Sequence, residues 1–293
     1  MSVQWFPGHM RESVKILKNA VKKANLVLEV VDARFPFSST NPYTETICRH
    51  MAKIKVMNKS DLADPDVTEQ WLSFYNDAAY NKTMQGETFA VSALNKGDIR
   101  ELSEYCLSET SINPAEKLKI IVMGIPNTGK STLINCLIGK KAARVGNVPA
   151  VTRHNQRLSV GKRMDVYDTP GILWPVVEPE ERGNILSAGG AVSDSAYDYT
   201  DIGAFLAGYM LKRYPEHLKN RYNIGVSECD GVEVLSLIGK KRGCLVKGGR
   251  IDLQKVSEIF VNEVRQGKTG RISFEKPDDI TQLEKIGPEK SSQ

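Results

Sequence analysis

KIIVMGIPNTGKSTLINCL, residues 119–137, decides the fold class of this chain. Residues 120–123 have the continuous apolar character of a buried strand, and the residues from Ser131 onward are typical of a helix. Between them, GIPNTGKS (residues 124–131) matches the phosphate-binding pattern G-x-x-x-x-G-K-S/T in full. Glycines let successive N–H groups turn toward phosphate oxygens, and the helix N-terminus adds its dipole. The stretch predicts a nucleotide site, in which Lys130 bridges the β- and γ-phosphates and Ser131 ligates Mg²⁺.

The chain around this loop alternates short apolar runs with amphipathic stretches. Strands are expected within residues 25–33, 53–58, 87–94, 118–124 and 163–171, and helices within 10–24 and 129–139. This alternation predicts an α/β domain with a mostly parallel sheet flanked by helices, whose functional loops follow the carboxyl ends of the strands.

A second, smaller and all-helical domain is expected after the proline-rich connector that follows residue 171. Helical spacing there involves Ile202, Phe205, Leu206 and Tyr209, and then Leu253, Val256, Ile259, Phe260 and Val264, with Asp252 as N-cap and Gly267 as stop. We therefore divide the chain into a nucleotide-binding domain (residues 1–176), a helical domain (177–280) and a flexible polar tail (281–293).

NKSD, residues 58–61, raises the question of which base is bound. Guanine presents N1–H and N2–H₂ donors together, and the Asp61 carboxylate can accept both, with Asn58 near the base edge and the Lys59 stem against the ring. The same tetrapeptide is also a good turn and helix start. However, residues 91–94 (VSAL) follow another predicted strand, where Ser92 and the Ala93 N–H would meet guanine O6. Together the two loops favour guanine.

DTPG, residues 168–171, follows the predicted strand MDVY, residues 164–167. Asp168 would hold Mg²⁺ through a water, and the Gly171 N–H would meet the γ-phosphate, although DTPG is also an ordinary turn sequence. Thr152, between the phosphate loop and DTPG, is a further candidate for Mg²⁺ and γ-phosphate contact. Additional nucleotide contacts are expected from Asn127, Thr128, Gly129 and Thr132.

The order of these motifs is unusual. Here NKSD and SAL come before the phosphate loop, Thr152 and DTPG, whereas a Ras-like domain begins with the phosphate loop and ends with SAL. The motifs thus keep their cyclic order but start at a different one. A circular permutation produces this order, and a fold tolerates it when its chain ends lie close together. The expected fold is therefore a circularly permuted Ras-like P-loop domain.

Nearly the whole chain resembles the circularly permuted ribosome-assembly GTPases of the RbgA/YlqF type. The resemblance rests on the rotated order, WFPGHM (residues 5–10), DAR (32–34), GIPNTGKSTLIN (124–135) and residues 241–275. It implies a cytoplasmic, monomeric GTPase that acts in late maturation of the large ribosomal subunit through its rRNA. One departure is PAVT (149–152), where the family commonly has Pro-Gly-Val-Thr.

Hydrolysis requires an oriented water, and the sequence lacks the usual residue for it. Ras-like enzymes place Gln directly after the DTPG-type loop, where this chain has Ile172, and an aliphatic side chain cannot orient water. The resemblance implies that His9 takes this role, beside Lys130 and Thr152, and that Asn127 helps to bind K⁺ next to the phosphates. A slow enzyme that needs stimulation by the ribosomal subunit is the plainer expectation.

A basic cluster lies in the helical domain. Its members are Lys240, Lys241, Arg242, Lys247 and Arg250, which suit RNA phosphates. A solvated loop has the same composition, and the family resemblance favours RNA. Two alternatives stay open: an ATP-using P-loop phosphotransferase, and a non-catalytic GTP-sensing RNA-binding switch.

The composition excludes several other classes of protein. The 293 residues are 41% hydrophobic and 26% charged with a net charge of +5, and no apolar run is long enough to cross a membrane. The five cysteines are scattered without a C-x-x-C pair, which favours neither a disulfide framework nor a zinc site.

Overall fold

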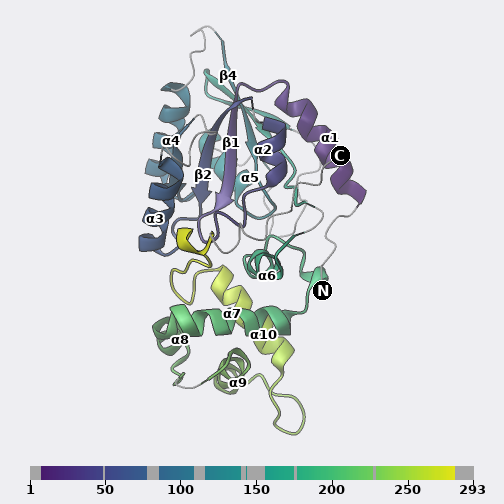
Figure 1. The fold of residues 1–293 in the computed structure, drawn as a ribbon, viewed down its shortest axis with the longest axis vertical. Coiled ribbons are helices and arrows are strands. Elements are labelled where there is room, and N and C mark those ends of the chain that lie inside the picture. Colours follow the sequence, from purple (N-terminus) through teal and green to yellow (C-terminus); the bar gives the residue numbers. More distant parts are fainter. Residues whose placement is uncertain are drawn as a thin grey trace.

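One six-stranded sheet organises the chain. The computed structural model describes residues 8–48, 50–77, 86–108, 116–139, 143, 156–174, 177–226 and 229–280. Within them the strand order is β3-β2-β1-β4-β6-β5 (Figure 1). The strands are β1 (Leu26–Asp32), β2 (Ala52–Asn58), β3 (Thr88–Val91), β4 (Leu118–Met123), β5 (Gln156–Val160) and β6 (Met164–Asp168). All neighbouring strands are parallel except β5 and β6, which confirms the mostly parallel sheet.

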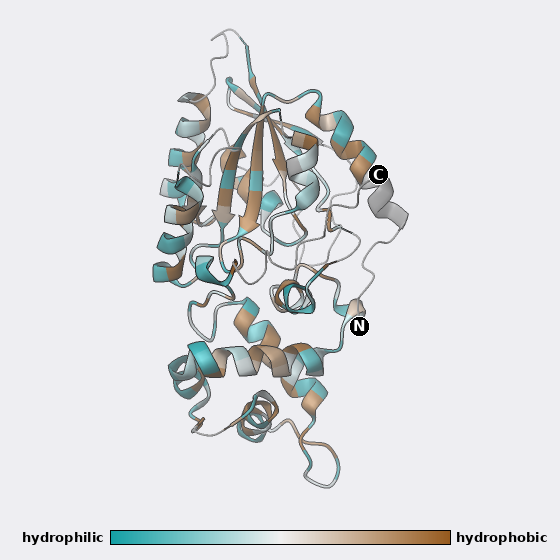
Figure 2. Ribbon diagram, in the orientation of Figure 1, coloured by the Kyte–Doolittle hydropathy of each residue, from teal (hydrophilic) through white to brown (hydrophobic). Residues whose placement is uncertain are grey.

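The central strands are apolar on both sides because helices cover both faces of the sheet (Figure 2). All seven residues of β1 are buried. Leu26, Leu28 and Val30 face the helices α4 (Lys96–Ser108) and α5 (Lys130–Ile138). The alternate residues Val27 and Val31 face the opposite layer, which consists of α1 (Gly8–Val21), α2 (Pro42–Cys48) and α3 (Pro65–Asn76).

The edge strand β5 is absent from the strands that the sequence predicts. Its sequence QRLSV is short and polar, with Arg157 and Ser159 exposed and Leu158 and Val160 half-buried. An edge strand has only one neighbour, so it lacks the continuous apolar run that identifies the central strands.

The helical region lies beyond the carboxyl ends of the parallel strands (Figure 1). It contains α6 (Glu180–Ala188), α7 (Tyr199–Arg213), α8 (Pro215–Tyr222), α9 (Gly231–Arg242), α10 (Leu253–Arg265) and the 3₁₀ helices η2 (Asp194–Ala196) and η3 (Pro277–Asp279). The apolar spacing predicted for α7 and α10 is confirmed, since Ile202, Leu206 and Phe260 are buried in one core. Asp252 caps α10 by accepting a hydrogen bond from the Lys255 N–H at 3.0 Å.

The core of the helical region also takes side chains from the sheet side of the molecule. Phe35, Ile125, Leu173 and Trp174 are buried in the same cluster as the helices. The two predicted domains therefore share apolar contacts, and a boundary at residues 176 and 177 stays a prediction. The predicted tail, residues 281–293, lies outside the described residues.

The sheet confirms the permuted Ras-like fold. The strands that lead into NKSD and SAL come first in the chain, yet β4, which leads into the phosphate loop, lies in the middle of the sheet between β1 and β6. Among the described helices, none combines the length and the apolar character needed to cross a bilayer.

Candidate nucleotide site

Five loops meet at one edge of the sheet. They follow β1, β2, β3, β4 and β6, whose parallel direction brings all their carboxyl ends to the same side. These loops carry Asp32, NKSD, SAL, the phosphate loop and DTPG. Motifs that are far apart in sequence are thus adjacent in space.

The phosphate loop has the backbone of an anion cradle. Gly124, Asn127 and Gly129 have φ values of 152°, 61° and 87°, and α5 begins directly afterward at Lys130. A Cβ on Gly124 would lie 2.2 Å from the Val30 carbonyl oxygen, so only glycine fits there. A tight loop that leads directly into a helix N-terminus is the backbone arrangement that binds phosphate groups.

Lys130 is a buried cation in this loop. Its Nζ donates to the Ile125 carbonyl oxygen at 2.7 Å, and the residue is 6% exposed. Burial lowers the pKa of Lys130 to about 8, against the raising effect of Asp168. The hydrogen-bond partner of Lys130 Nζ is a neutral carbonyl oxygen, and a bound phosphate group would supply a negatively charged partner.

Asn58 connects three of the loops. Its Nδ2 donates to the Thr128 carbonyl oxygen at 2.8 Å, and its Oδ1 accepts from the Ala93 N–H at 3.1 Å. A Cβ on Gly129 would lie 2.3 Å from Asn58 Nδ2, so the phosphate loop and NKSD are in close contact. Both polar atoms of the Asn58 side chain therefore bond to other loops of the protein. The sequence had instead predicted that Asn58 lies near the edge of the base.

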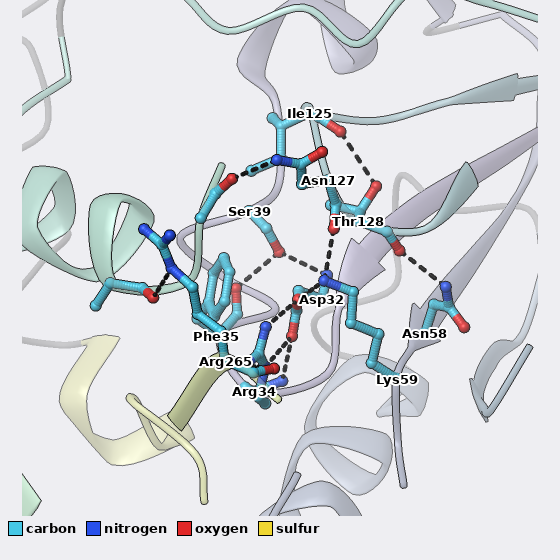
Figure 3. Close-up of polar contacts among 12 residues, drawn as sticks. Asp32, Arg34, Phe35, Ser39, Asn58, Lys59, Ile125, Asn127, Thr128 and Arg265 are labelled. Atoms are coloured by element: carbon cyan, nitrogen blue, oxygen red, sulfur yellow. Dashed lines mark hydrogen bonds and ion pairs between the residues drawn. The ribbon is translucent and has the colours of Figure 1, made fainter. Parts of the chain in front are cut away.

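Lys59 has a similar connecting role. Its ammonium forms an ion pair with Asp32 Oδ2 at 2.8 Å and donates to the Asn127 carbonyl oxygen at 2.5 Å (Figure 3). The residue adopts a left-handed φ of 63°. Asp61, two positions later, is exposed and is thus accessible to a ligand.

Asp32 and Arg34 are site residues whose roles sequence reasoning missed. Arg34 donates from Nε to Asp32 Oδ1 and from Nη2 to Asp32 Oδ2, both at 2.9 Å, and each residue is 1% exposed. Burial raises the pKa of Asp32, but Arg34 and Lys59 outweigh it and hold the pKa below its ordinary value. The DAR triplet supported the family resemblance, but nothing in it indicated Lys59 as a partner.

DTPG lies beside the phosphate loop. The Ser131 Oγ donates to Asp168 Oδ2 at 3.4 Å, and the Thr169 Oγ1 donates to the Val122 carbonyl oxygen at 2.6 Å. A Cβ on Gly171 would lie 2.8 Å from Pro126 and 3.0 Å from Lys130 Nζ. The two motifs thus form one wall of the site.

Ile172, in the position of the usual Gln, is 3% exposed, and its carbonyl oxygen accepts from Asn41 Nδ2 at 2.6 Å. It is therefore part of the core. Thr152 lies outside the described residues, and only the backbone of His9 is described, in the first turn of α1.

A cavity of 960 Å³ adjoins the site between α4 and α5. It begins at Ala93 and Leu94 of the SAL loop and at Thr132 of α5, and continues past Lys96, Arg100 and Asn135. Two of the residues predicted to contact the nucleotide, Ala93 and Thr132, therefore line a hollow next to the phosphate loop.

Asn127 connects the phosphate loop to the helical region. Its Nδ2 donates to the Gly190 carbonyl oxygen at 2.6 Å (Figure 3). The neighbouring Ala188 carbonyl oxygen accepts from Arg265 Nε at 3.1 Å. The five cations predicted to bind RNA lie elsewhere, on the last turn of α9 and the loop after it, and all five are exposed.

The loops and the sheet define a circularly permuted P-loop nucleotide-binding protein. The family described as 50S ribosome-binding GTPase matches residues 119–203. Ribosome biogenesis GTPase A of Bacillus cereus is 38% identical and is aligned over 98% of this chain and 99% of its own. The Thermotoga maritima protein of the same name is 33% identical over 96% of this chain and 97% of its own.

A solved structure agrees with these sequence comparisons. GNP-bound YlqF from Thermotoga maritima superimposes with a TM-score of 0.65 at 28% identity, over 91% of this chain and 99% of that one. The chain therefore belongs to the ribosome biogenesis GTPase A family. The family resemblance seen in the sequence is confirmed.

Proposed function

We propose that this protein binds GTP, hydrolyses it to GDP and phosphate, and acts as an assembly factor in late maturation of the large ribosomal subunit. The observation that carries the proposal is the Asn58 amide, which joins the base-reading loops to the phosphate loop through Ala93 and Thr128. Such a bridge fixes the distance between a guanine site and a triphosphate site.

The base is selected by Asp61 in this proposal. Its carboxylate is exposed, and it follows Lys59, whose ammonium is fixed by Asp32 and Asn127. The nucleotide would be enclosed by Asn58, Lys59, Asp61, Ser92, Ala93, Asn127, Thr128, Gly129, Lys130, Ser131, Thr132 and Gly171.

Nucleotide competition tests the choice of base. We expect Asp61→Asn to weaken GTP binding about a hundredfold, because two hydrogen bonds to a charged acceptor are lost, and to increase affinity for xanthosine triphosphate. Asp66→Asn, an exposed aspartate in the first turn of α3, is the matched control and should leave GTP affinity unchanged. Equal binding of ATP and GTP by the wild-type protein would instead support the ATP-using alternative.

Mg²⁺ fits the residues present. Mg²⁺ prefers oxygen ligands and is held by one or two protein groups together with phosphates and water. The Ser131 hydroxyl and the Asp168 carboxylate form such a pair, and the described residues contain no cluster of three or more potential acidic, histidine or cysteine ligands. We assign Ser131, Asp168 and Thr152 to the ion, which would neutralise charge on the phosphates when bound.

Hydrolysis is assigned to Lys130, Thr152 and His9. Lys130 holds the phosphates, and Thr152 completes the Mg²⁺ and γ-phosphate contacts. The family resemblance assigns the orientation of the attacking water to His9. The buried Ile172 has no polar side chain for this task. Asn127 is the proposed K⁺ ligand, and its amide is held by the Gly190 carbonyl.

One set of hydrolysis measurements tests both assignments. The wild-type protein and His9→Ala are compared with ribosomal subunits present, each in K⁺ and in Na⁺. We expect His9→Ala to lower the rate by 10²- to 10⁴-fold, as loss of a water-orienting group does, and Na⁺ to slow the wild-type enzyme. Full activity of His9→Ala would exclude this role, equal rates in the two salts would remove K⁺, and no turnover at all would favour the non-catalytic switch.

The partner is the precursor of the large ribosomal subunit, contacted through its rRNA by the basic cluster. All five members are exposed, on the last turn of α9 and the loop after it, in the part of the helical region farthest from the sheet (Figure 1). We expect the protein to act as a monomer in the cytoplasm.

A further inference from the structure

A short hairpin, residues 243–252, projects between α9 and α10 at the end of the molecule opposite the sheet (Figure 1). Backbone hydrogen bonds close it: the Val246 N–H donates to the Arg250 carbonyl oxygen, and the Asp252 N–H to that of Cys244, both at 2.9 Å. Leu245 and Ile251 form an antiparallel bridge. Cys244, 1% exposed, anchors the base of the hairpin in the helical core. The hairpin thus has a defined shape and is held away from the core.

The first arm of the hairpin exposes two adjacent aliphatic side chains. Leu245 is 52% exposed and Val246 is 41% exposed, and they are two of only four large apolar residues so exposed in the described part of the chain. Single exposed apolar residues are common on protein surfaces. Two together on a closed hairpin, with no acidic residue between positions 243 and 251, are not explained by packing within this chain.

The cations around the tip fall into two groups. The Arg242 guanidinium pairs with Glu263 Oε1 at 2.8 Å and lies 5.6 Å from the centre of the Tyr222 ring, so it stabilises the contact between α9, α8 and α10. By contrast, the other four exposed cations take part in no ion pair with another described residue; they are Lys240, Lys241, Lys247 and Arg250. Two of these cations therefore lie on the hairpin itself, and the other two lie on the last turn of α9 directly before it.

We infer that hairpin 243–252 is a two-part RNA-binding element. Lys247 and Arg250 of the hairpin contact phosphates together with Lys240 and Lys241 of the last turn of α9. Leu245 and Val246 lie against sugars and base edges. RNA suits this shape because the minor groove of its double helix is wide and shallow and its loops expose unstacked bases. A protein partner fits less well, since lysine is depleted at protein interfaces. The inference rests on the proposed function and adds to it that RNA affinity has an apolar component.

The two components are separable by the salt dependence of binding. The full-length protein, loaded with a non-hydrolysable GTP analogue, is titrated onto large-subunit precursors and onto their protein-free rRNA at several salt concentrations. For Lys247→Gln/Arg250→Gln we expect the slope of log K against log salt to fall by about 1.4 to 1.8, since each phosphate contact contributes about 0.7 to 0.9. For Leu245→Ser/Val246→Ser we expect about tenfold or more weaker binding with an unchanged slope.

Matched controls exist in the chain. Val232→Ser removes an aliphatic side chain of similar exposure, 43%, at the start of α9, and Lys22→Gln/Lys23→Gln removes an exposed cation pair after α1. Both should bind like the wild-type protein. Unchanged GTP affinity and circular dichroism show that each hairpin variant is folded.

Two results would overturn the inference. Wild-type affinity of Leu245→Ser/Val246→Ser for the precursor would remove the apolar contact. Loss of binding to the precursor with retained binding to protein-free rRNA would mean that the tip contacts a ribosomal protein. Failure of the wild-type protein itself to bind the precursor would instead contradict the proposed function.

Discussion

At the scale of single residues, the site contains a cation that opposes folding. Lys130 is almost fully buried, and its hydrogen bond to Ile125 only partly replaces the lost hydration. The lowered pKa of about 8 expresses this cost. A residue proposed to bind phosphate therefore reduces the stability of the nucleotide-free protein.

Lys130→Met is expected to stabilise the nucleotide-free protein by about 1–3 kcal/mol at pH 7 while abolishing GTP binding. Because the pKa of Lys130 is lower in the folded state than in the unfolded state, the cost is complete below pH 8. It disappears as the pH rises from about 8 toward 10.5. Urea unfolding at pH 7 and pH 10 measures this: the advantage of the variant should shrink at pH 10. A variant less stable than the wild type at pH 7 would contradict the argument.

The motifs proposed to form the nucleotide site are recognisable in the sequence by residue type, but the contacts that connect them are not. GIPNTGKS and DTPG have recognisable spacings because every phosphate site needs the same backbone and the same oxygen ligands. The bonds from Asn58 to Thr128 and from Asn127 to Gly190 span 70 and 63 positions. Such contacts depend on how the strands are ordered in the sheet, and no local pattern encodes that order.

At the scale of elements, the loop of residues 33–41 after β1 connects the sheet to the end of the helical region. Glu275 is 2% exposed; its Oε1 accepts from the Ser38 N–H at 2.9 Å and from the Phe37 N–H, and its Oε2 accepts from Ser38 Oγ. The Trp71 Nε1 donates to the Glu275 carbonyl oxygen at 3.1 Å. Burial raises the pKa of Glu275 to about 7, although the hydrogen bonds from Ser38 lower it.

The pH dependence of stability tests this contact. Because the folded state holds the Glu275 proton more tightly than the unfolded state, stability falls as the pH rises from about 4.5 to 7. Relative to Glu275→Gln, the wild-type protein should gain about 2 kcal/mol between pH 8 and pH 5.5. Glu258→Gln, an exposed glutamate on α10, is the control and should follow the wild type. A difference between wild type and Glu275→Gln that does not vary with pH would contradict the assignment.

Helices and strands with strong periodic patterns were predictable from the sequence, but the contacts between these elements were not. The buried strands and the apolar stripes of α7 and α10 follow from spacing alone. The polar strand β5 did not, since it lies at the sheet edge. Residues 33–41 carry no periodic signal, because their partners Arg182 and Glu275 lie more than 140 positions away.

At the scale of the whole molecule, the two motifs proposed to contact the γ-phosphate bond to the helical region or to the loop of residues 33–41. Asn127 of the phosphate loop bonds Gly190, directly after α6. The Ile172 carbonyl, one residue after DTPG, accepts from Asn41 at the end of loop 33–41. The permutation adds a covalent link, because DTPG leads directly into the connector to α6. A change at the γ-phosphate therefore has short paths to the helical region, whose far end carries the surface proposed to bind rRNA.

Gly189 is the position at which this coupling is most open to test. A Cβ there would lie 2.2 Å from the Phe35 ring, while its φ of −71° suits any residue, so Gly189→Ala changes packing and not backbone strain. We expect the turn after α6 to move away from Phe35 and weaken the Asn127–Gly190 contact. GTP affinity should stay near that of the wild type, whereas the ratio of subunit affinities in the GTP-analogue and GDP states should approach one.

Gly208→Ala on α7 is the matched control, because a Cβ there meets nothing within 4 Å and alanine favours the helix by up to about 1 kcal/mol. It should preserve the affinity ratio and raise the thermal midpoint, whereas Gly189→Ala should lower the midpoint by several degrees. Cosedimentation with large-subunit precursors in both nucleotide states measures the ratio. If Gly189→Ala keeps the wild-type ratio despite its lower stability, the signal passes instead through Asn41 and the connector, because those contacts do not involve Gly189.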